Sequence, residues 1–113
     1  GFAFVYDALG VAQVLDADGN VVTPGARVTD VVLDDGTPIV VGGAVVPGPA
    51  LNIATIDFLA KGGDQYPYRG APFTTLGVTY QQSLANYIVQ GLGGLISGPD
   101  YPVGGEGRIT RIN

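Results

Sequence analysis

The chain has 113 residues, of which 46% are hydrophobic and 13% are charged, and its formal net charge is −5. This length suits one domain with a hydrophobic core, and the low charge content excludes a disordered polar tail. The absence of cysteine and histidine excludes disulfides, thiolate metal sites and histidine-based metal or general-base sites.

The basic residues are dispersed, whereas a nucleic-acid-binding surface needs a clustered basic stripe, so we expect no nucleic-acid partner. They are Arg27, Lys61, Arg69, Arg108 and Arg111. Two uncharged stretches, residues 36–56 and 70–99, are interrupted by Gly, Pro, Asn or Gln, so we expect no membrane insertion by this chain. No basic segment followed by an apolar one begins the sequence, and we expect any targeting signal to lie upstream of Gly1.

The first half of the chain consists of short β-branched or aromatic runs separated by turn residues, which predicts strands. We expect them at residues 2–7, 11–15, 21–22, 27–33, 39–41, 44–46 and 51–56. An Asp-Gly turn signal within residues 16–20 predicts a hairpin. Asp16, Asp18 and Asn20 also have the spacing of a calcium loop, but Arg27 stands where the loop needs its bidentate Glu, so we interpret them as a turn.

The clearest predicted helix begins near Thr79, which has the spacing of a capping box with Gln82. Apolar residues then follow helical spacing on one face, which we expect to pack in the core. They are Tyr80, Leu84, Tyr87, Ile88, Leu92 and Leu95. A second short helix is expected near Phe58, and residues 107–112 are expected to close a sheet. The pattern predicts a β-rich α+β domain, because no βαβ alternation is present.

Residues 54–66 resemble the signature of the 5′-nucleotidase C-terminal domain family, in which a strand is followed by Asn/Asp-Phe-Leu-Ala, one variable residue, and Gly-Gly-Asp before an aromatic. Three further stretches are similar to that family in order and spacing: Gly1–Asp7, Pro24–Val28 and Glu106–Ile109. The resemblance covers essentially the whole chain. Ile56 and Gln65 depart from the family pattern, which often has Asn and Gly there.

The resemblance implies that residues 1–113 form a substrate-recognition domain with a layered α/β/β/α fold, lacking its N-terminal part. In that family it follows a metallophosphoesterase domain of the same polypeptide, which binds two divalent metal ions and cleaves the phosphate ester. The family includes 5′-nucleotidases, UDP-sugar hydrolases and 2′,3′-cyclic phosphodiesterases. This chain would therefore be one part of an extracytoplasmic metal-dependent hydrolase, with no catalytic residue, metal or cofactor of its own, and inactive alone.

By the same resemblance, Phe58 stacks on the base of a nucleotide or nucleoside, and Asp64 contacts the ribose hydroxyls. Elementary chemistry agrees, because aromatic rings stack on any base and an ionised carboxylate only accepts hydrogen bonds. Gly62 and Gly63 permit close approach to a ligand, and Tyr66 is expected at the pocket wall. The alternative is a non-catalytic, β-rich cell-surface or adhesion module, which would give Phe58 and Asp64 no reason to face one open cleft.

Overall fold

The computed structural model describes residues 1–68 and 70–113, and these form two compact units. The first unit comprises Gly1–Asn52 and Gly104–Asn113, and the second comprises Ile53–Val103. Among the described residues all strands belong to the first unit and all helices to the second, so the chain is of the α+β class. Arg69, one of the dispersed basic residues, lies outside the described residues.

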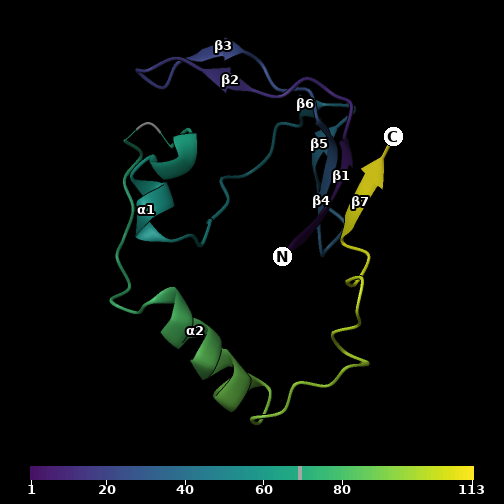
Figure 1. Ribbon diagram of the computed structural model, residues 1–113, viewed down its shortest axis with the longest axis vertical. Coiled ribbons are helices and arrows are strands. Elements are labelled where there is room, and N and C mark those ends of the chain that lie inside the picture. Colours follow the sequence, from purple (N-terminus) through teal and green to yellow (C-terminus); the bar gives the residue numbers. More distant parts are fainter. Residues whose placement is uncertain (69) are drawn as a thin grey trace. The chain divides into compact units, whose positions relative to one another are not determined.

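The first unit is built on a five-stranded sheet with the strand order β6-β5-β4-β1-β7 (Figure 1). Neighbouring strands are antiparallel except β1 and β7, which are parallel. The strands are β1 (Phe2–Asp7), β4 (Val28–Leu33), β5 (Pro38–Val41), β6 (Ala44–Val45) and β7 (Ile109–Ile112). Each confirms a strand predicted from a short β-branched, aromatic or alternating run beside turn residues, because these are local signals.

A separate two-stranded hairpin joins β2 (Val14–Leu15) to β3 (Val21–Thr23), which confirms the predicted turn. The Asp16 carboxylate accepts hydrogen bonds from the backbone N–H groups of Asp18 and Asn20, at 3.0 and 2.8 Å. It also accepts from the Asn20 side-chain amide, and these hydrogen bonds lower the pKa of Asp16. The turn thus satisfies its backbone donors internally, as Asp-rich turns commonly do.

One face of β1 carries a row of three aromatic rings. The ring centroids of Phe2 and Phe4 lie 6.1 Å apart, and those of Phe4 and Tyr6 lie 6.2 Å apart. Their antiparallel neighbours on β4 include Leu33, paired with Phe2, and Val31, paired with Phe4. None of these side chains is fully buried. The sheet therefore groups its apolar residues on one face without enclosing them.

The second unit contains helix α1 (Asp57–Ala60), a 3₁₀ turn η1 (Gly63–Gln65), helix α2 (Tyr80–Asn86) and a π-helical turn η2 (Tyr87–Gly91). The predicted cap of α2 is confirmed, because the Thr79 hydroxyl accepts a hydrogen bond from the Gln82 backbone N–H at 3.1 Å. The return bond of a capping box is replaced, since the Gln82 side chain donates to Asn86 instead.

Two expectations are wrong. Residues 51–56 form no strand, because no strand of the described chain pairs with them. The helical face predicted as core is open: Tyr80 is 75% exposed, Leu84 and Tyr87 are exposed, and Ile88 is half-buried. Helical spacing identifies an apolar face but does not supply the surface that would cover it.

Candidate functional site

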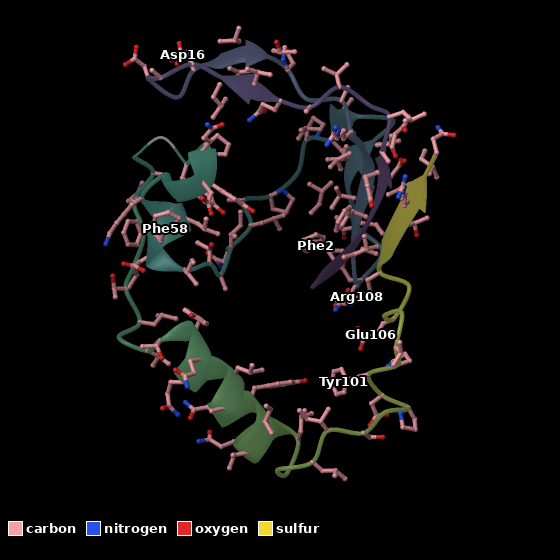
Figure 2. All side chains as sticks on the ribbon, in the orientation of Figure 1. Phe2, Asp16, Phe58, Tyr101, Glu106 and Arg108 are labelled. Atoms are coloured by element: carbon pink, nitrogen blue, oxygen red, sulfur yellow. The ribbon has the colours of Figure 1, made fainter. Side chains whose placement is uncertain are left out.

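Phe58 lies in the single turn of α1, which confirms the short helix expected near this residue (Figure 2). The turn is closed by backbone hydrogen bonds from Ala60 to Ile56 and from Lys61 to Asp57, both at 3.0 Å. Ala60, at 8% exposure, is the one residue of the described chain that is buried. The helix therefore packs on its alanine, while the Phe58 side chain remains 53% exposed.

The ring of Phe58 packs against Gly63. A Cβ atom placed on Gly63 would lie 2.5 Å from Cε1 of the ring and 2.6 Å from both Cδ1 and Cζ. No real side chain tolerates such approaches, so this ring position requires glycine at residue 63. Gly62 serves a different need, because its φ of 92° lies in the left-handed region that glycine adopts most readily.

Asp64 directly follows the glycine that supports the ring. Its backbone is left-handed, with φ 51° and ψ 29°, and Gln65 follows with φ 62°. Non-glycine residues rarely adopt this conformation, although aspartate and asparagine do so more often than most. Such backbone outliers concentrate at functional sites. The Asp64 carboxylate is exposed and has no hydrogen bond or ion pair with any other described residue.

Tyr66 is held in the same loop by its backbone N–H, which donates to the Gly63 carbonyl at 3.1 Å. Its ring stacks on Tyr68, with centroids 6.0 Å apart and an interplanar angle of 16°. One face of the Tyr66 ring is thus taken up by contact with Tyr68, although Tyr66 remains 47% exposed. The i, i+2 spacing of Tyr66 and Tyr68 was the sequence signal from which this ring pair could have been predicted.

An ion pair flanks Phe58. The Lys61 ammonium lies 2.9 Å from the Asp57 carboxylate, with the i, i+4 spacing that brings side chains together on a helix. The hydrogen bond from Lys61, followed by its charge, lowers the pKa of Asp57. Both side chains are exposed, so the pair orders the surface beside Phe58 more than it stabilises the fold.

Two surface depressions of about 80 and 410 Å³ lie in the first unit, and neither is lined by residues of the 57–68 loop. The expected cleft in front of Phe58 and Asp64 is therefore not one of them. In residues 1–68 and 70–113, no cluster of three or more His, Cys, Asp or Glu side chains could hold a metal ion. None of the helices described has the length and apolar character needed to cross a membrane.

The other family-like stretches meet in the first unit. The backbone N–H of Asp7, which ends β1, donates to the Arg27 carbonyl at 2.7 Å, and that of Phe4 donates to the Arg108 carbonyl at 2.8 Å. Arg108 also forms an ion pair with Glu106 at 2.8 Å (Figure 2). The Arg27 side chain donates a hydrogen bond to the carbonyl of Gly10 at 3.0 Å, so it supports the fold of this unit.

Comparison of the chain with protein-family models, with curated proteins and with solved structures found no match.

Proposed function

We propose that this chain is the nucleoside-recognition domain of a 5′-nucleotidase-type phosphohydrolase. Phe58 stacks on the base and Asp64 accepts hydrogen bonds from the ribose hydroxyls. The observation that carries the proposal is the turn itself: the half-exposed Phe58 ring rests on Gly63, and the next residue carries an exposed carboxylate that no other described residue contacts by a hydrogen bond or ion pair. Exposure alone would not single out Phe58, because most large apolar side chains of the chain are exposed.

The proposal assigns the phosphate to another part of the enzyme. With a net charge of −5 and no candidate metal cluster among its described residues, this chain is better suited to the neutral nucleoside than to the phosphate. A metallophosphoesterase domain of the same polypeptide would contribute two divalent metal ions, which supply an activated water and stabilise developing charge. We infer a layered α/β/β/α arrangement for the complete recognition domain and an extracytoplasmic location, both from the family resemblance.

The position of Asp64 supports recognition over the adhesion alternative. Aspartate, like asparagine, adopts a left-handed backbone more readily than most residues, so this turn accommodates an acidic side chain. It places a carboxylate on the residue that follows the ring-supporting Gly63. One turn would then recognise both a base, through Phe58, and its sugar, through Asp64.

The test is a titration of the 113-residue chain with adenosine, followed by NMR at the Phe58 ring and the Asp64 amide. Phe58→Leu keeps an apolar side chain but removes the ring, and loss of stacking should weaken binding by roughly 1–3 kcal/mol. Phe73→Leu is the matched control, because Phe73 is a similarly exposed phenylalanine of the same unit. Asp64→Asn should weaken binding of adenosine but not of 2′,3′-dideoxyadenosine, which lacks the diol.

Equal binding by Phe58→Leu and the wild-type chain would contradict the stacking role. Hydrolysis of AMP by the purified chain with added divalent metal would contradict the division of labour. A further check is the coding sequence before Gly1, in which the proposal expects a metal-binding Asp-x-His stretch and a Gly-Asn-His stretch.

A further inference from the structure

We propose that Gly63 is a positioning residue for base recognition: its bare α-carbon holds one face of the Phe58 ring, so that the ring offers only its other face to a nucleobase. The inference rests on the proposed function, since it specifies how the same ring would meet its ligand. The packing of the Phe58 ring on Gly63 can also be tested without any ligand.

The distances define how the ring lies. A Cβ on Gly63 would lie almost equally far from three successive atoms of the Phe58 ring, at 2.5, 2.6 and 2.6 Å. A group approaching the ring edge within the ring plane would lie much closer to one atom than to its two neighbours. Nearly equal distances therefore place the Cβ direction over the face of the ring. The α-hydrogen that a side chain would replace points at the π-face.

The two glycines have separate roles. Gly62 has a φ of 92°, and the nearest atom to its Cβ position is the Tyr66 carbonyl oxygen at 3.9 Å, so that residue is glycine for its backbone conformation. Gly63 is outside the left-handed region, and its need for glycine comes from the ring alone. Substitutions at the two positions therefore disturb the turn in different ways.

The contact has a functional consequence. Phe58 is 53% exposed and has no enclosing core, so without a support its ring would be free to sample several rotamers. Resting one face on Gly63 restricts the ring before a ligand arrives, and pre-organisation of this kind strengthens binding by reducing its entropic cost. A base bound at this turn is then stacked on one side only by Phe58, beside the Asp64 carboxylate.

The first experiment uses the free 113-residue chain. Because a proton above an aromatic face is shifted upfield by the ring current, one Gly63 α-proton should be displaced upfield and should return in Phe58→Leu. Gly98→Ala is the control in the same unit, and it should leave the Gly63 α-proton shift unchanged. A Cβ at residue 98 meets no atom within 4 Å, and φ there is not positive. A Gly63 α-proton without this shift overturns the inference, whatever the chain binds.

The second experiment is a double-mutant cycle on adenosine affinity. Gly63→Ala should displace the Phe58 resonances and weaken binding about as much as Phe58→Ala, by roughly 5-fold to 150-fold. In the Phe58→Ala background, Gly63→Ala should add less than about 2-fold, because its effect passes through the ring. Gly62→Ala strains the turn without touching the ring, so its Phe58 resonances should keep their wild-type shifts.

An equal loss of affinity from Gly63→Ala in both backgrounds would overturn the inference, because Gly63 would then act on the ligand directly. A shifted Gly63 α-proton in a chain that shows no response to adenosine would overturn the proposed function while leaving the packing of the ring established. The two failures are thereby distinguishable.

Discussion

Gly10 offers a sharp test of the first unit, because it lies where the end of β1 meets the start of β4. A Cβ on Gly10 would lie 2.9 Å from the Ala26 carbonyl oxygen, 3.1 Å from Cα of Arg27 and 3.2 Å from the Asp7 carbonyl oxygen. All three are backbone atoms. The corner is held by backbone hydrogen bonds of 2.7 Å from Asp7 to Arg27 and of 3.2 Å from Gly10 to Asp7. The corner therefore cannot yield as a flexible side chain would.

Gly10→Ala should lower the free energy of unfolding by about 1–3 kcal/mol through overpacking. Each hydrogen bond displaced in relieving the clash would add about 0.5–1.5 kcal/mol, so we expect a total loss of about 3 kcal/mol. Urea unfolding followed by far-UV circular dichroism measures the loss. Hydrogen exchange at the Asp7 amide locates it at the corner.

The matched control is Gly48→Ala in the same unit, where a Cβ meets no atom within 4 Å and φ is not positive. This substitution should be neutral, or stabilising by up to about 1 kcal/mol, because alanine restricts the unfolded chain. If Gly10→Ala unfolds at the same urea concentration as Gly48→Ala, the close approach of the two strands at this corner is refuted.

Two further predictions concern the helices. Thr79→Ala should reduce the stability of α2 by about 1 kcal/mol because the Gln82 amide loses its hydrogen bond to the cap, whereas Thr79→Ser should retain that bond. Hydrogen exchange at Gln82 and Ser83 measures the difference. Equal protection of these amides in both variants would contradict the capping role. Lys61 lowers the pKa of Asp57, so the ion pair stabilises α1 above about pH 4. This stabilisation is lost as the pH falls through the folded-state pKa of Asp57. Lys61→Gln should return the pKa of Asp57 toward its ordinary value in a carboxyl-carbon NMR titration, and an unchanged titration curve would exclude the pairing.

The strands and turns of the first unit were predictable because their signals are local. The hairpin at Asp16–Asn20 follows from carboxylate-to-backbone bonds within five residues, and the half-buried alternation of β4 follows from the pleat. The cap at Thr79 is equally local. Structure that depends on neighbouring residues alone can be predicted from the sequence.

The two wrong expectations both depend on distant partners. Residues 51–56 have the composition of a strand, but a strand exists only when another backbone pairs with it. The apolar face of α2 has helical spacing, but burial requires a covering surface, and Tyr80 and Leu84 lack one. Periodicity shows which residues of a segment share an apolar face, but it does not show whether another segment packs on that face.

The candidate site was predictable in its residues and not in its geometry. Resemblance singled out Phe58, Gly63 and Asp64, whereas their spacing gave no indication that the ring would lie on the glycine or that Asp64 would be left-handed. A Gly-Gly pair in sequence looks like one flexible corner. Only coordinates separate the glycine needed for its φ from the glycine needed for its missing side chain.

The four family-like stretches therefore carry unequal weight as functional evidence. Gly1–Asp7, Pro24–Val28 and Glu106–Ile109 are joined by backbone hydrogen bonds in one sheet, so folding alone accounts for their residues. Residues 54–66 lie in the second unit, where the Phe58 ring is 53% exposed and the Asp64 carboxylate has no hydrogen bond or ion pair with any other described residue. A recognition role must consequently be tested at Phe58, Gly63 and Asp64, because substitutions in the sheet would report on stability whether or not the chain binds a nucleoside.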